Sequence, residues 1–292
     1  MDLVIQIQAI IMLKRKSSFS EGARMIAGHR QRESIDKIVK SLIADPAVIA
    51  VFLKGSIAKE QDDDYSDVDL YCMVTETLIH DFLHRRLMHL EKYKSMVFVE
   101  EVNFVAPQIV AVFEDGLHFD LYTVTEKSLV CTGEVKALYD PTQMLRDYQN
   151  EGFYIDTESI QQLLDELTFN LLEFDAAYNR NDLIWASRLA SHMTGTLSLI
   201  LRAIKDPQNG KLGMKRLSQY LSDDEHEKFS AIMDGIGPSD LHNGLVQILA
   251  FIDELVLTYA LSMKHEAFYH MMSEQIRKSV YENEVVKPSK SE

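Results

Sequence analysis

The spacing of hydrophobic and polar positions changes near residue 150. Up to that point, short alternating runs predict strands, with two amphipathic segments that predict helices. The expected strands are 47–55, 66–74, 96–105, 108–113, 117–124 and 135–139. The expected helices of this half are 33–44 and 77–94. Asp115-Gly116, between two of the strands, is typical of a hairpin turn.

Beyond residue 150, apolar residues recur every three or four positions, as in the helices of a bundle. The helices expected there are 158–179, 182–205, 224–234, 239–264 and 266–283. The pattern predicts an α+β protein with a mixed-sheet domain at 1–150, whose core is 33–140, followed by an all-α helical-bundle domain at 151–292. The last residues of that second domain are expected to form a frayed tail.

Composition narrows the classes of function. The chain has 292 residues, of which 46% are hydrophobic and 26% are charged, as in an ordinary globular protein. Its net charge is -15, which disfavours general nucleic-acid binding and would attract a cationic small substrate.

The ends and the cysteines bear on localisation. The apolar run within residues 1–13 is too short to span a membrane, and its basic cluster follows the run, which is the wrong order for a secretory signal. Cys72 and Cys131 lie in no metal-binding or redox spacing. We therefore expect a cytoplasmic protein without a membrane partner.

Candidate chemistry is concentrated in residues 51–74. A strand ends in Gly55-Ser56, and the next strand opens with Asp67-Val68-Asp69. Side chains two apart on a strand share a face, so Asp67 and Asp69 project together. Paired carboxylates repel each other unless a cation lies between them, and their oxygens suit Mg²⁺.

Two further features complete this pattern. Gly55 lets the backbone turn sharply and lets a phosphate approach closely, while Ser56 supplies a hydroxyl. In the strand at 117–124, Asp120 shares a face with His118 and Tyr122. A carboxylate in an otherwise apolar strand is costly unless it has a function, so Asp120 is a third candidate.

The order of these elements resembles the DNA polymerase β-like nucleotidyltransferases. A strand is followed by Gly-Ser, a linker, a strand that opens with Asp-x-Asp, and a later strand in which an Asp stands between apolar residues. The length and the helical second half look like the two-domain aminoglycoside and lincosamide adenylyltransferases. The resemblance implies that Asp67, Asp69 and Asp120 hold one or two Mg²⁺, and that the Gly-Ser turn grips the triphosphate. It also implies transfer of a nucleoside monophosphate, AMP from ATP, to a hydroxyl of a small molecule such as an aminoglycoside-type antibiotic. In some members the third acid acts as the general base or lies beside it.

The basic residues follow the family only in part. Members often carry Arg directly after the Gly-Ser, where this chain has Ile57, and Lys59 is the nearest cation. Arg202 and Lys215 have the spacing of two cations that reach the triphosphate from the helical domain in relatives. Cations there would neutralise charge on the leaving pyrophosphate. A solvated basic loop at a helix end explains the same residues without any function.

A non-catalytic reading stays open beside the enzyme: a nucleotide-binding or antitoxin-like regulator with the same fold. The complete set of three acids favours the enzyme. His80 and His84 lie one helical turn apart, but no third zinc ligand is evident, so a solvent-facing helix explains them better. The sequence names neither the acceptor nor the oligomeric state.

Overall fold

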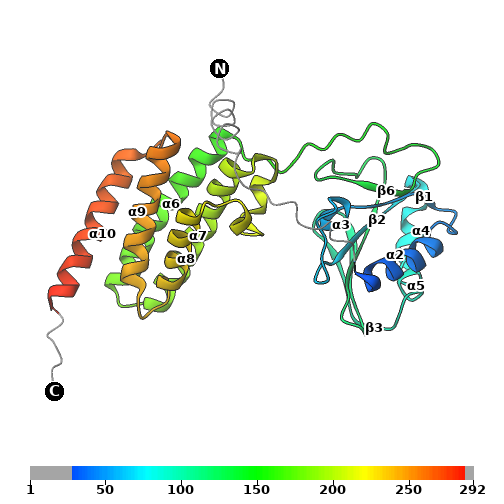
Figure 1. Cartoon of the computed structure of the whole chain (residues 1–292), viewed down its shortest axis with the longest axis horizontal. Helices are drawn as coiled ribbons and strands as arrows, with labels where there is room; N and C mark the ends of the chain where they lie inside the picture. Colours follow the sequence, from blue (N-terminus) through cyan, green and yellow to red (C-terminus); the bar gives the residue numbers. More distant parts are fainter. Residues whose placement is uncertain (1–27, 287–292) are drawn as a thin grey trace. The chain divides into compact units, whose positions relative to one another are not determined.

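The computed structural model describes residues 28–286, so the apolar N-terminal run and the tail beyond residue 286 lie outside the described residues. The chain divides into two compact units that meet in sequence at Gly152 and Phe153. The first unit holds a mixed sheet and the second holds helices, which confirms the predicted α+β fold (Figure 1).

The N-terminal unit is built on a six-stranded sheet with the order β3-β4-β5-β2-β1-β6. Its strands are β1 (Val48–Leu53), β2 (Val68–Val74), β3 (Met96–Asn103), β4 (Pro107–Phe113), β5 (His118–Val124) and β6 (Lys136–Tyr139). Each falls within or beside a predicted strand. The central neighbours β2 and β5 are parallel, whereas all other neighbours are antiparallel. Parallel pairing brings the start of β5 beside the start of β2.

Helices cover one face of this sheet, as Figure 1 shows. They are α2 (His29–Leu42), α4 (Ile79–Arg85) and α5 (Leu87–Leu90). Residues such as Ile38 and Phe82 pack there against Leu70 and Phe119, all four fully buried. A smaller cluster around Phe52 and several other apolar side chains lies on the opposite face. Alternation along β2 and β5 therefore separates the face packed against the helices from a second face, which carries Asp69, His118 and Asp120 beside this small cluster and is called the polar face below.

The single helix predicted over 77–94 is wrong. A 3-10 turn, η1 (Glu76–Leu78), precedes α4, and α4 and α5 are separate short helices. Beyond Arg86 the backbone tightens, because the amides of His89 and Tyr93 bond to carbonyls three residues earlier rather than four. Arg86 and His89 are both buried at this break, which amphipathic periodicity alone could not show.

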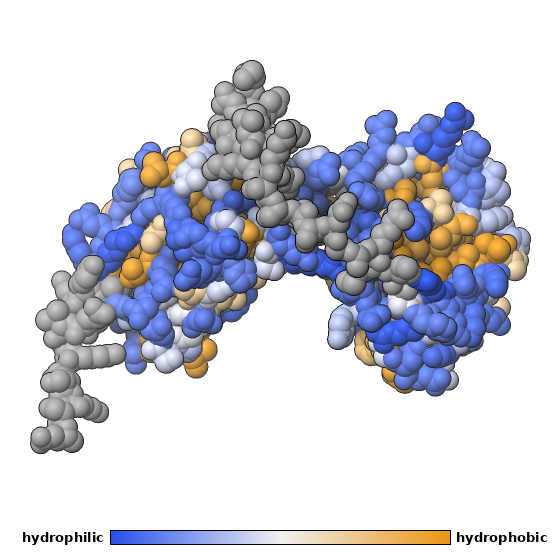
Figure 2. Space-filling model, in the orientation of Figure 1, coloured by the Kyte–Doolittle hydropathy of each residue, from blue (hydrophilic) through white to orange (hydrophobic). Residues whose placement is uncertain are grey.

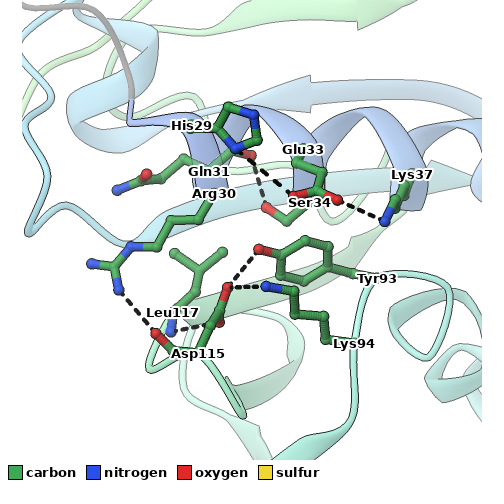
Figure 3. A network of polar contacts seen from close by, with 10 residues as sticks. All are labelled: His29, Arg30, Gln31, Glu33, Ser34, Lys37, Tyr93, Lys94, Asp115 and Leu117. Carbon is green, nitrogen blue, oxygen red and sulfur yellow. Dashed lines mark hydrogen bonds and ion pairs between the residues drawn. The ribbon is translucent and has the colours of Figure 1, made fainter.

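The first turn of α2 ties together the segments that carry the candidate carboxylates. Arg30 donates to the carbonyls of Asp64 and Asp115, at 2.6 and 3.2 Å, and so joins the linker before β2 to the β4–β5 hairpin. Asp115 also accepts hydrogen bonds from Tyr93 (2.6 Å) and Lys94 (3.0 Å), as Figure 3 shows. The buried Gln31 donates to the carbonyl of Ser66 at 3.0 Å. This network fixes the approach to both β2 and β5.

The second unit is helical. Its helices are α6 (Thr157–Asn179), α7 (Leu183–Lys205), α8 (Asp223–Gly235), α9 (Leu241–Tyr259) and α10 (Glu266–Val286). Between α7 and α8 lie two 3-10 turns, η2 (Pro207–Leu212) and η3 (Leu217–Gln219). Leucines and other apolar residues from all five helices form one core. Helix α9 ends earlier than predicted, because Ala260 adopts a left-handed conformation with φ 50°.

Helix α9 is the one described helix that is long and apolar enough to cross a membrane. Its buried residues, among them Leu245, Ile248 and Ile252, pack into the helical core, and it carries Asp253 and Glu254. Core helices of globular proteins have the same length and composition. The face in Figure 2 is mostly hydrophilic, with hydrophobic residues in patches on both units.

Candidate active site

The polar face of β2 and β5 brings the predicted carboxylates together. Asp69 and Asp120 are register partners on these parallel neighbours, and Asp67 lies directly before β2. Val68 and Leu70, which alternate with the aspartates, are fully buried on the other face. Alternation within each strand and parallel pairing between them thus put all three aspartates on one face.

Asp67, His118 and Asp120 form the tightest group on this face. One ligand atom from each lies within 4.8 Å of the others. Nε2 of His118 is 3.2 Å from Oδ1 of Asp120, and Nδ1 is 3.8 Å from Oδ2 of Asp67. The Asp120 side chain is only 9% exposed, whereas that of His118 is 44% exposed. The group is therefore open to solvent on one side and anchored in the sheet on the other.

The third carboxylate, that of Asp69, lies against the Gly-Ser turn. Gly55 has φ 67°, and a Cβ built on it would lie 2.0 Å from Oδ2 of Asp69. The amide of Lys54 donates to the carbonyl of Asp69 at 3.0 Å, which joins the two strands at this point. Only glycine fits here, because the conformation is left-handed and the carboxylate fills the space of a side chain.

Burial and like charge act on the same group. Burial raises the pKa of Asp120, and the nearby Asp67 charge adds to this, while a hydrogen bond from Gln108 and the proximity of His118 partly oppose it. Burial also raises the pKa of Tyr122, and the charges of Asp69, Asp120 and Asp67 raise it further. The face thus gathers negative charge, as a cation-binding site requires.

The donor set fits a divalent cation. Carboxylate oxygens are hard ligands that suit Mg²⁺, and the two aspartates of the group can reach one point. Glycine at position 55 leaves the space that the Asp69 carboxylate occupies beside them. The residues present can therefore hold the cation that the resemblance implies.

The remaining predicted residues of the first unit lie around Gly55. Gly55 and Ser56 open a short helix, α3 (Gly55–Ala58), which the sequence did not predict. Lys59 caps this helix, and its amide donates to the carbonyl of Gly55 at 3.3 Å. Ser56 and Lys59 are both partly exposed.

Lys54 is a buried cation that sequence reasoning missed. Its Nζ donates to the carbonyls of Val130 and Thr132, at 2.8 and 3.0 Å, and lies 4.9 Å from the centre of the Tyr71 ring. Burial lowers the pKa of its ammonium group to about 8. The signal was present, since Lys54 alternates with Leu53 and so belongs on the polar face.

In the helical unit, Arg202 is 3% exposed. Its guanidinium donates to the carbonyl of Lys215 at 2.9 Å, pairs with Asp206 at 3.0 Å and stacks on the Tyr220 ring at 4.1 Å. Lys215 itself is exposed. Arg202 thus holds the loop that presents Lys215, and the binding of triphosphate by these two residues stays a prediction.

Besides Lys54, three further contributors were absent from the predicted site: His118, Arg30 and Gln31. The alternation along 117–124 already put His118 on the face of Asp120, so its position was readable although no role was assigned to it. Arg30 and Gln31 were missed because the helix was expected to begin at residue 33. Their partners are carbonyls distant in sequence, which no local pattern reveals.

The chain is similar to several solved structures and matches one family of known proteins. None of the curated proteins matches it. Among solved structures, an aminoglycoside 6-adenyltransferase from Bacillus subtilis aligns with a TM-score of 0.41 and 13% identity, over 86% of this chain and 98% of that one. A nucleotidyltransferase-like protein from Exiguobacterium sibiricum aligns with a TM-score of 0.38 and 12% identity, over 88% of this chain and 80% of that one. A CD-NTase from Bradyrhizobium diazoefficiens in complex with GTP aligns with a TM-score of 0.31 and 12% identity, over 96% of this chain and 97% of that one.

The sequence profile of streptomycin adenylyltransferase matches residues 29–281, which is most of the chain and spans both units. This confirms the resemblance drawn from the Gly-Ser and Asp-x-Asp elements and makes the protein a nucleotidyltransferase. The chain belongs to the streptomycin adenylyltransferase family.

Proposed function

We propose that the protein transfers AMP from ATP to a hydroxyl group of a small cationic molecule, in a Mg²⁺-dependent reaction. The observation that carries this proposal is the grouping of Asp67 and Asp120 at the start of β2 and β5, in a member of an adenylyltransferase family. Asp69 completes the acid set beside Gly55.

Each residue has a role in this proposal. Asp67, Asp69 and Asp120 hold the cation through carboxylate oxygens. Gly55, Ser56 and Lys59 receive the phosphates of ATP, and Arg202 and Lys215 add positive charge to them. Since the Arg202 guanidinium is buried, Lys215 makes the direct contact in this scheme and Arg202 positions it.

The reaction is an in-line displacement. The acceptor oxygen forms a bond to the α-phosphorus while the bond to the β-phosphate oxygen breaks, and pyrophosphate leaves. The hydroxyl proton passes to a neighbouring base, and Asp120, the third acid of the set, acts as this base or lies beside it, as in some members of the resembled superfamily. Bound Mg²⁺ supplies positive charge that stabilises the attacking and leaving oxygens.

A cationic acceptor is supported by charge near the site. The protein carries a net charge of -15. On the polar face, strand pairing puts Glu100 of β3 two strands from Asp120, since Val110 of β4 is the register partner of both. Glu100 is exposed, so its carboxylate can meet an ammonium group of an aminoglycoside-type acceptor.

The proposed reaction takes place in the cytoplasm, and the free cysteines Cys72 and Cys131 support this location.

The proposed function is tested by pyrophosphate release from ATP and Mg²⁺ in a screen of aminoglycosides, lincosamides and tRNA. We expect turnover with an aminoglycoside-type acceptor, and a loss of at least about 100-fold in Asp67→Asn, Asp69→Asn and Asp120→Asn with the fold intact. If only anionic acceptors supported turnover, the proposal of a cationic, aminoglycoside-type acceptor would be wrong.

The same screen addresses the alternative of a non-catalytic regulator. If ATP binds to the wild type but no acceptor supports turnover, and the aspartate variants bind ATP in the same way, the regulator replaces the enzyme as the best reading. Membership of an adenylyltransferase family and the complete acid set favour turnover.

A further inference from the structure

His118 is the one group besides the aspartates that takes part in the tight cluster of this face. Each of its two ring nitrogens is directed at a different carboxylate, Nε2 at Asp120 and Nδ1 at Asp67. A histidine that served only to orient Asp120 would need one of these contacts. One ring nitrogen and one oxygen of each carboxylate also lie close enough together for a single cation to contact all three residues.

The backbone holds His118 firmly in this position. It is the first residue of β5, paired with Val112 of β4, and its successor Phe119 is paired with Val68 of β2. Phe119 is fully buried in the core, so the strand cannot rotate His118 away from the face of Asp120 without exposing that ring. The half-exposed imidazole keeps access to solvent and to ions.

The distances suit shared coordination. Ligand atoms around an octahedral ion of this size lie about 3 Å apart when adjacent and about 4 Å apart when opposite, given metal–ligand bonds of about 2.1 Å. One ring nitrogen of His118 and one oxygen from each of the two carboxylates lie within 4.8 Å of one another, which is slightly more than the separation of opposite ligands. Little movement is required for three ligand atoms to meet one ion.

We propose that His118 supplies a nitrogen ligand to the divalent cation held by Asp67 and Asp120, and that this biases the site toward Mn²⁺ over Mg²⁺. The inference rests on the proposed function, which puts the cation at these aspartates. Mg²⁺ prefers all-oxygen surroundings, whereas imidazole nitrogen binds later transition metals better along the series that begins with Mn²⁺. A nitrogen in the set therefore gains more for Mn²⁺ than for Mg²⁺.

The experiment measures metal binding directly, without turnover. The full chain is titrated with Mn²⁺ at about pH 8, above the usual imidazole pKa of about 6.5, and free Mn²⁺ is followed by electron paramagnetic resonance. Mg²⁺ affinity is obtained by competition. Pulsed measurements on bound Mn²⁺ then report ¹⁴N coupling from a ligating imidazole. The variants are His118→Asn, His118→Ala and Asp67→Asn.

His192→Asn is the matched control. His192 is a histidine of similar exposure, 46%, whose Nε2 lies 2.7 Å from Glu166 in the helical unit. We expect His118→Asn and His118→Ala to weaken Mn²⁺ binding by about tenfold, to change Mg²⁺ binding much less, and to remove the ¹⁴N coupling. His192→Asn should leave all three readouts as in the wild type.

The outcomes separate the two proposals. If Asp67→Asn weakens Mn²⁺ binding but His118→Asn and His118→Ala do not, and no imidazole coupling is seen, the inference is overturned and the proposed metal site survives. If the wild type binds no Mn²⁺, the inference is overturned. If Asp67→Asn binds Mn²⁺ as well as the wild type does, the metal centre of the proposed function fails and the inference fails with it.

Discussion

The polar face of the sheet and the core of the helical unit treat charge in opposite ways. On the polar face of the sheet, carboxylates gather beside one another, and burial together with the Asp67 charge raises the pKa of Asp120. In the helical unit, buried charges are matched: Lys205 lies 2.7 Å from Glu225. Burial raises the pKa of Glu225, but hydrogen bonds from Lys205 and Ser222 outweigh it, so the net pKa is lowered.

This difference distinguishes charges that serve the candidate site from charges that stabilise the fold. Opposite charges that meet in a pair stabilise the fold around them without any ligand. Like charges that meet in a sheet cost folding energy and persist where a bound cation or substrate repays it. The following predictions test whether this division holds, beginning with the largest expected change in stability.

Arg202→Ala should destabilise the helical unit by about 3 kcal/mol, because it leaves Asp206 without its buried partner and frees the carbonyl of Lys215. Trp185, the single tryptophan of the chain, lies in α7 and reports unfolding of this unit by fluorescence in urea.

Lys215→Ala is the control, since its exposed side chain should change stability by less than about 0.5 kcal/mol. In calorimetry, Lys215→Ala should nevertheless weaken ATP binding by about 1–3 kcal/mol. Unchanged ATP affinity in both variants would remove these two residues from the nucleotide site.

Gly55→Ala should lower the free energy of unfolding by about 2 kcal/mol, because alanine is strained at φ 67° and its Cβ would meet Asp69. The displaced carboxylate should also reduce turnover by about 100-fold. Gly195→Ala is the matched control: nothing lies within 4 Å of its Cβ position in α7, so it should gain about 0.5–1 kcal/mol. Equal effects of the two variants would contradict the close packing of Asp69 on Gly55.

Asp120→Asn should stabilise the metal-free protein near neutral pH, because it removes a carboxylate whose pKa is raised by burial. A raised pKa means that the folded state holds the Asp120 proton more tightly, so this stabilisation is present below the unfolded pKa and is lost as pH rises through the folded pKa. The advantage of the variant should therefore vanish below about pH 4 and grow toward neutrality. Thermal unfolding in a chelator measures it.

Asp206→Asn should change the free energy of unfolding in the opposite direction to Asp120→Asn. It removes the partner of the buried Arg202 and should destabilise the protein at neutral pH. If Asp120→Asn also destabilises the metal-free protein, the carboxylates of the sheet are structural partners rather than a site that awaits a cation.

Local periodicity was enough to find the face of the candidate site. Alternation puts Asp67 and Asp69 together, and it puts His118 with Asp120, because side-chain direction in a strand is a local property. The parallel register that makes Asp69 and Asp120 partners depends on the whole sheet, and so does the position of Asp69 against Gly55. Neither can be derived from spacing within a strand.

Besides strand register, the burial of a polar residue cannot be derived from the spacing of residues in the sequence. The interval between Arg202 and Lys215 suggested two cations that both reach a phosphate, yet the guanidinium is enclosed by Asp206 and Tyr220. The predicted helix at 77–94 failed for a similar reason, since Arg86 and His89 are buried at its break. Polar residues at buried positions follow tertiary partners, which the sequence pattern does not encode.

The contacts of Lys54 bear on how this module can be cut or recombined. Its ammonium holds the loop between β5 and β6 to the sheet, and Tyr148 further along donates to the carbonyls of Thr132 and Gly133 at 3.1 and 2.8 Å. A fragment that ended at residue 140 would lose Leu145 from the small core and Tyr148 from beside Lys54. An isolated or transplanted first unit must therefore start early enough to include Arg30 and extend to about Gly152, where the two units meet in sequence.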